Sequence, residues 1–107
     1  MTDLLARGIN FFNSGQYFEA HEAWEDLWRA TRGPLRLFYQ GLVQAAVGLH
    51  HFSRGNLNGG RAQLTKSISK LCQYPPRFCQ IDNEAFVNDL REILEHGHAR
   101  PIAIIRG

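Results

Sequence analysis

The chain contains 107 residues, 44% of them hydrophobic, and its formal net charge is +2. This length and composition are typical of one globular domain with a modest core, covering residues 1–107. No apolar run is long enough to cross a membrane, since the best one, Leu42 to Leu49, is short and contains Gln44. The first residues lack the basic and apolar regions of a signal peptide, so we expect a cytoplasmic protein with no membrane partner.

The first part of the chain predicts two helices and the start of a third. Thr2 or Asp3 can cap the first helix, and the run at residues 13–15, Asn-Ser-Gly, ends it. The second helix begins at Tyr17 and ends near Thr31. A turn at residues 32–34 follows, in which the proline suits the first position of the next helix.

The third predicted helix, Leu35 to Ser53, is apolar nearly all round and therefore belongs at the centre of the domain. It has one polar stripe, formed by Gln40, Gln44 and His51. Two glycines, Gly41 and Gly48, lie beside this stripe and would let another backbone approach closely.

Two more helices and an extended tail are predicted in the rest of the chain. The fourth helix covers roughly residues 58–73. After a loop, Asp82 or Asn83 caps the fifth helix, and Gly97 stops it. The short apolar tail at residues 101–105 lies either in a groove of its own domain or against a second copy. A homo-oligomer formed through this tail is therefore one candidate assembly.

A weak internal repeat relates residues 8–15 to residues 48–55. The matching positions are Gly8, Phe12 and Gly15 in the first copy and Gly48, Phe52 and Gly55 in the second. Each copy is a helix, a glycine turn and a second helix, and such units at a period near 40 are typical of stacked hairpins of the tetratricopeptide kind. We therefore predict an all-α fold of about five helices packed as antiparallel hairpins, a tetratricopeptide-like bundle with a short extended C-terminal tail.

The second helix carries a histidine in the middle of its buried face. His21 lies between Tyr17, Trp24 and Trp28 on that side. Glu25 follows one turn later, and an imidazole and a carboxylate at i and i+4 meet on a helix surface. This pair is either a satisfied structural contact or the start of a site.

Antiparallel packing is expected to bring the second and third helices face to face. His21 is then level with about Ala45, so Gln40 and Gln44 should face the His21–Glu25 edge inside an aromatic pocket. His51 would be an outer member of this cluster, whereas His50 lies on the other side of the helix as a packing or surface residue. The predicted ligand pocket consists of Tyr17, Trp24, Trp28, Gln40 and Gln44.

Four interpretations of the cluster stay open. The first is a structural hydrogen-bond network, because buried polar groups must find partners. The second is a metal site in which His21 and Glu25, completed by His51 or His50, bind a divalent ion such as zinc, nickel, iron or manganese. The third is acid–base chemistry in which Glu25 orients His21. The fourth is a non-catalytic interaction module. No nucleophile is suggested by spacing, so catalytic residues stay unassigned.

Charge and cysteine usage add little to these alternatives. Five basic residues and no acid lie between residues 54 and 81, namely Arg54, Arg61, Lys66, Lys70 and Arg77. We interpret this run as a solvated helix face, which does not favour a nucleic-acid partner. Cys72 and Cys79 are expected to be reduced, half-buried thiols.

The stretch from Phe12 to Trp28 resembles a bacterial and archaeal family of small helical proteins, domain of unknown function family 309. His21, Glu25 and Trp28 match the family's H-x-x-x-E-x-x-W/Y motif, and residues 40–44 and 55–56 also look like the family. The resemblance covers roughly Leu4 to Leu71. It implies an all-α fold of packed hairpins and suggests metal binding at His21 and Glu25, with no established activity.

Overall fold

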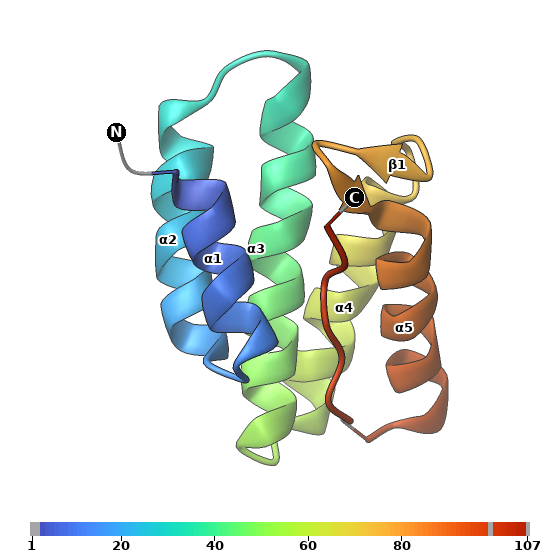
Figure 1. The fold of residues 1–107 in the computed structure, drawn as a ribbon. Coiled ribbons are helices and arrows are strands. Elements are labelled where there is room, and N and C mark those ends of the chain that lie inside the picture. Colours follow the sequence, from blue (N-terminus) through green and yellow to red (C-terminus); the bar gives the residue numbers. More distant parts are fainter. Residues whose placement is uncertain (1–2, 99, 107) are drawn as a thin grey trace.

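The computed structural model describes residues 3–98 and 100–106, which form five α-helices and a small β-hairpin (Figure 1). The elements are α1 (Leu4–Asn13), α2 (Tyr17–Ala30), α3 (Pro34–Ser53), α4 (Leu57–Leu71), β1 (Arg77–Phe78), β2 (Ile81–Asp82) and α5 (Asn83–His96). The two strands are antiparallel. The prediction of an all-α bundle is confirmed. The hairpin between α4 and α5 was predicted only as a loop.

Helix ends follow the capping residues of the sequence. Asp3 and Asp82 each accept a 3.1 Å hydrogen bond from a backbone N–H in the first turn of α1 and α5. Asn83, the alternative cap of the last helix, is instead its first residue, and Thr2 lies outside the described residues. Gly97 ends α5 in the left-handed conformation, with φ of 75°.

The internal repeat is a repeat of structure. Gly15 and Gly55 turn the α1–α2 and α3–α4 hairpins with φ of 77° and 80°. In both turns the glycine N–H donates a 3.0 Å hydrogen bond, to the carbonyl of Phe12 in the first and of Phe52 in the second. Positions 40 residues apart therefore adopt the same conformation, as the sequence repeat predicts.

The two hairpins also share their point of closest helix approach. A Cβ added at Gly8 would lie 2.1 Å from Nε1 of Trp24, and one added at Gly48 would lie 2.8 Å from Cδ2 of Leu64. Both neighbours follow their glycine by 16 positions. Absence of a side chain at these two glycines lets the paired helices approach closely.

The apolar α3 occupies the centre of the bundle, packed between α2 and α4 (Figure 1). Its buried residues are Phe38, Tyr39, Gly41, Leu42, Ala45, Ala46, Gly48, Leu49 and Phe52. Although α3 is long and apolar, no helix in the described part of the chain meets the length and hydrophobicity needed to cross a membrane. Location in the cytoplasm stays a prediction.

The C-terminal tail lies in a groove of its own domain. Residues 100–106 pass from the end of α5 back toward the β-hairpin (Figure 1), and Ile102 and Ile104 are buried. The side chain of Asn13 donates to the Ile104 carbonyl at 3.1 Å and accepts from the Ile104 N–H at 2.8 Å. The intrachain alternative for the tail is therefore the one the fold adopts. Much of the apolar surface on which the predicted homo-oligomer depends is used within the chain.

Candidate functional site

His21 and Glu25 meet on the surface of α2, as their spacing predicts. Nε2 of His21 lies 2.7 Å from Oε2 of Glu25, and the two side chains are 25% and 26% exposed. The second carboxylate oxygen, Oε1, pairs with Arg29 one turn further along. The row therefore consists of the imidazole of His21, the carboxylate of Glu25 and the guanidinium of Arg29, each four residues after the one before.

A cleft of about 220 Å³ opens beside this row, between α2 and α3. We call it the aromatic cleft, and it is lined by Phe18, His21, Val47 and His50. The Phe18 ring lies beside both histidines, with centroid distances of 5.9 Å to His21 and 5.7 Å to His50. Phe18 is 49% exposed, which is unusual for a large aromatic side chain. The cleft therefore offers an open aromatic ring with two imidazoles beside it.

None of the three residues of the polar stripe of α3 lines this cleft. Gly41 and Gly48, the two glycines beside the stripe, lie against α4. His51 contacts the α3–α4 turn, where its Nδ1 is 3.4 Å from Nδ2 of Asn56. Gln44 makes no direct hydrogen bond to Glu25 or His21, and its buried Oε1 has no partner among the described residues. On α3 the cleft is lined by Val47 and His50, and the sequence predicts a packing or surface role for His50.

Two of the aromatic residues predicted to line the pocket belong mainly to the core. Trp24 is fully buried, and its Nε1 donates a 3.2 Å hydrogen bond to the carbonyl of Leu5. Tyr17 is half-buried and packs edge-on against Phe12, with ring centroids 5.2 Å apart. These side chains stabilise the α1–α2 hairpin and do not line the aromatic cleft.

Trp28, the last residue of the family motif, lies further along α2. The guanidinium of Arg36 stacks over its ring at 4.3 Å, which places Trp28 against the start of α3. Its indole Nε1 is buried and has no hydrogen-bond partner within residues 3–98 and 100–106. Gln40, two turns before Val47 on α3, is half-buried and is not part of the cleft lining.

The residues that sequence reasoning missed are Phe18 and Val47, and it undervalued His50. A signal for them exists in the spacing. Phe18 and His21 are at i and i+3 on α2, while Val47 and His50 have the same spacing on α3. Each pair covers one turn of its helix, and antiparallel packing brings the two turns together. The sequence prediction followed the polar residues of α3, whereas the residues of α3 that line the cleft are Val47 and His50.

The donor set at His21 does not fit the metal that the family resemblance suggests. Both oxygens of Glu25 already contact cationic or imidazole nitrogens, and His51 is held at the α3–α4 turn. Throughout residues 3–98 and 100–106, no three His, Cys, Asp or Glu side chains are grouped closely enough to hold a metal ion. A stable site needs three or four such ligands, so His21 and Glu25 lack the partners for one.

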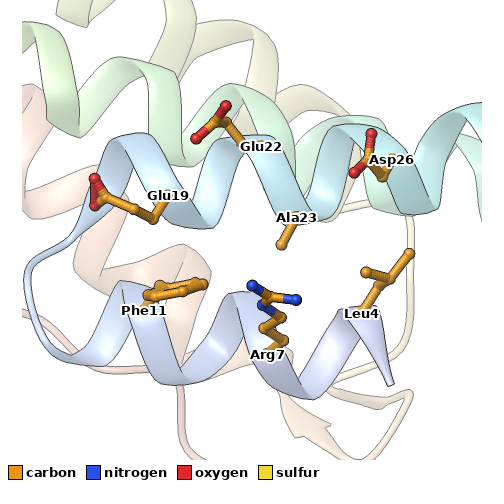
Figure 2. A pocket seen from close by; sticks show the side chains of 7 residues that line it. All are labelled: Leu4, Arg7, Phe11, Glu19, Glu22, Ala23 and Asp26. Atoms are coloured by element: carbon orange, nitrogen blue, oxygen red, sulfur yellow. The ribbon is translucent and has the colours of Figure 1, made fainter. Parts of the chain in front are cut away.

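A second hollow of about 230 Å³ lies between α1 and α2, on the acidic side of α2 (Figure 2). Glu19, Glu22 and Asp26 border it, and Arg7 reaches from α1 toward Ala23 (Figure 2). The Arg7 guanidinium lies 5.7 Å from the centroid of the Phe11 ring. None of the bordering carboxylates forms an ion pair with it in the described part of the molecule. Glu22 and Asp26 are exposed and Glu19 is half-buried, so this is a charged groove open to solvent.

The two cysteines are free thiols, and they differ in exposure. Cys79 is half-buried, and burial raises its pKa. Burial also raises the pKa of its neighbour Tyr39, and the nearby thiol adds to that rise. Cys72 is exposed, contrary to our expectation of a half-buried side chain.

The fold and the site define the structural class of this protein. It is a small all-α protein built from two equivalent helical hairpins and a fifth helix, and it carries an imidazole–carboxylate pair on its second helix. A family model described as "Domain of unknown function (DUF309)" matches residues 5–62, and the chain belongs to this family. The match covers α1 apart from its first residue, the whole of α2 and α3, and the start of α4, and it includes the whole aromatic cleft.

Two curated relatives are similar over most of this chain. An uncharacterized protein of Aquifex aeolicus is 28% identical over 94 residues, covering 87% of this chain and 27% of the relative. The uncharacterized protein YpuF of Bacillus subtilis is 32% identical over 90 residues, covering 83% of this chain and 45% of the relative. The chain therefore spans less than half the length of either relative.

Proposed function

We propose that this domain is a binding module that holds a small apolar ligand in the aromatic cleft. The observation that carries the proposal is the exposed ring of Phe18, which lies beside both His21 and His50 in the lining of an open cleft. Covering an exposed aromatic surface is favourable by about 25 cal/mol per Å² of apolar area removed from water. A cleft of about 220 Å³ is smaller than a site for a drug-sized molecule, and it suits a ligand about the size of one aromatic ring.

The two imidazoles supply the polar contacts that such a site needs. Most ligand sites combine an apolar lining with a few polar groups that fix orientation. Glu25 contacts Nε2 of His21, which favours one orientation of that ring and leaves its Nδ1 without a hydrogen-bond partner in the described residues. The His50 ring also lies beside Phe18, with the ring centroids 5.7 Å apart. This arrangement supports binding of an apolar ligand that carries one hydrogen-bonding group.

Titration with indole, followed by nuclear magnetic resonance of labelled protein, tests the proposal. Indole should shift the methyl signals of Val47 and the ring signals of His21 and His50, because these groups line the cleft. Phe18→Ala should remove most of the binding, since it deletes the exposed ring. Leu57→Ala is the matched control, because Leu57 is 43% exposed and is not part of the cleft lining.

Two results would contradict the proposal. Indole could shift signals elsewhere on the protein and leave those of Val47 unchanged. Alternatively, Phe18→Ala could bind indole as well as the wild type and the Leu57→Ala control do. Either result would leave the exposed ring of Phe18 without a part in binding.

A further inference from the structure

The contact between His21 and Glu25 decides which nitrogen of the imidazole carries the proton. Nε2 of His21 lies 2.7 Å from Oε2 of Glu25. An ionised carboxylate only accepts hydrogen bonds, and two acceptor atoms do not approach this closely unless one of them carries a proton. Nε2 therefore carries the proton, which leaves Nδ1 of the neutral ring as an acceptor.

Nδ1 of His21 is accessible to a ligand. It has no hydrogen-bond partner in the described residues. The buried side-chain nitrogen and oxygen atoms that lack a partner there belong to Trp28, Gln44 and Asn83, so Nδ1 of His21 is not among them and is open to solvent. The side chain is 25% exposed and lines the aromatic cleft. A ligand in the cleft can therefore reach this acceptor.

The second imidazole of the cleft has no carboxylate to fix its proton. His50 forms no ion pair within residues 3–98 and 100–106. Either of its ring nitrogens can carry the proton, so the ring can donate or accept as a ligand requires. His50 therefore adapts to the ligand, whereas His21 presents a fixed acceptor.

We infer that Nδ1 of His21 accepts a hydrogen bond from the ligand, so that the aromatic cleft selects aromatic compounds that carry an N–H or O–H group. The inference rests on the proposed function, because it concerns a ligand of the same cleft. Phe18 and Val47 supply the apolar lining, which does not distinguish a compound with a donor from one of the same shape without it. Glu25 does not line the cleft, and it acts as a positioning residue that keeps the proton of His21 on Nε2.

Indole and benzofuran test this selectivity, because they have nearly the same shape and differ in the group that they present to His21. Indole carries an N–H donor, whereas the ring oxygen of benzofuran carries no hydrogen. Each compound is titrated into the full chain and followed by nuclear magnetic resonance, at a pH at which the nitrogen-15 signals show a neutral His21 ring. Indole should bind about fivefold more tightly than benzofuran, the factor expected from one hydrogen bond.

The same nitrogen-15 signals report the position of the proton without any ligand. In a neutral imidazole the nitrogen that carries the proton and the one that does not have well-separated chemical shifts. Nε2 of His21 should be the protonated nitrogen, because Oε2 of Glu25 lies beside it. Added indole should then shift the Nδ1 signal, and benzofuran should shift it much less.

Two variants separate the acceptor from the shape of the cleft. Glu25→Gln should reduce the preference for indole, because a glutamine amide donates as well as accepts and no longer fixes the proton of His21. His21→Phe keeps an aromatic ring in the lining and removes the acceptor, so indole and benzofuran should bind equally tightly. Glu22→Gln is the matched control and should keep the preference of the wild type, because Glu22 is exposed on the same helix and does not line the cleft.

The inference is overturned if indole and benzofuran bind the wild type equally tightly, or if the neutral His21 ring carries its proton on Nδ1. It is also overturned if His21→Phe keeps the preference for indole. These three results leave the proposed function intact as long as indole shifts the signals of Val47. If neither compound shifts those signals, the proposed function fails and the inference fails with it.

Discussion

Glu25→Gln measures what the row of His21, Glu25 and Arg29 contributes to stability. Glutamine keeps nearly the same shape and removes the negative charge, so packing is preserved while two charge contacts are lost. All three side chains reach water, with exposures of 25%, 26% and 65%. Ion pairs screened in this way contribute about 0.2–1 kcal/mol each. We therefore expect the variant to lower the free energy of unfolding by about 1 kcal/mol, which corresponds to a fall in Tm of about 4–8 °C for a domain of this size.

The assay is thermal unfolding followed by circular dichroism, first with a chelator and then with added zinc, nickel or manganese. Glu22→Gln is the matched control, because Glu22 is exposed on the same helix and has no ion pair in the described residues. It should change stability by less than about 0.5 kcal/mol. Since His21 and Glu25 lack further ligands, metal should not raise the Tm of either protein.

Two outcomes would refute this reasoning. A Tm that rises with metal in the wild type and not in Glu25→Gln would show that the pair does recruit an ion. A loss well above about 3 kcal/mol would show that Glu25 belongs to a buried network, because breaking a buried pair costs that much.

Three further predictions concern the fold. Gly8→Ala should destabilise the protein by about 1–3 kcal/mol in urea denaturation, because its Cβ would lie 2.1 Å from the fully buried ring of Trp24; stability equal to the wild type would show that the two helices can separate freely. Asn13→Ala should release the tail and remove hydrogen-exchange protection at the Ile104 amide, whose acceptor it deletes; unchanged protection would mean that burial alone holds the tail. Burial raises the pKa of Cys79 above its ordinary value of 9.0, so the thiol loses its proton at a lower pH in the unfolded chain than in the folded one. The contribution of Cys79 to the free energy of unfolding is therefore fully present below about pH 9 and falls as the pH rises above it. Cys79→Ser should lessen this fall in denaturation measurements made at increasing pH, and an unaltered pH dependence would assign the fall to other groups.

Local signals account for the parts of the fold that the sequence predicted correctly. Asp3, Pro34 and Gly97 act within one turn of the helix ends they mark, so their meaning does not depend on the rest of the fold. The β-hairpin had no such signal. Its turn residues, Cys79 and Gln80, have φ of 51° and 59°, a conformation that usually selects Asn or Gly.

The candidate site likewise has one part that local sequence signals predict and one part that they do not. The contact between His21 and Glu25 lies within one helix, and its spacing was sufficient to predict it. Which residue of α3 faces it depends on the rotation of that helix about its own axis. Neighbouring residues differ by about 100° around a helix, so this rotation decides between His50 and His51. Gly41 and Gly48 pack α3 against α4 and so fix this rotation. Predicting it would have required knowing the α3–α4 interface as well as the α2–α3 interface.

The contact between Asn13 and Ile104 joins residues that are 91 positions apart, and this separation has a consequence for the order of folding. Each helical hairpin forms from neighbouring segments, so its assembly is fast. Closing a loop of this length carries a larger entropy cost, and nothing offsets that cost until the hairpins that form the groove exist. The tail should therefore dock in a late kinetic step. In the native state it should detach in a partial unfolding event that leaves the four helices of the two hairpins in place.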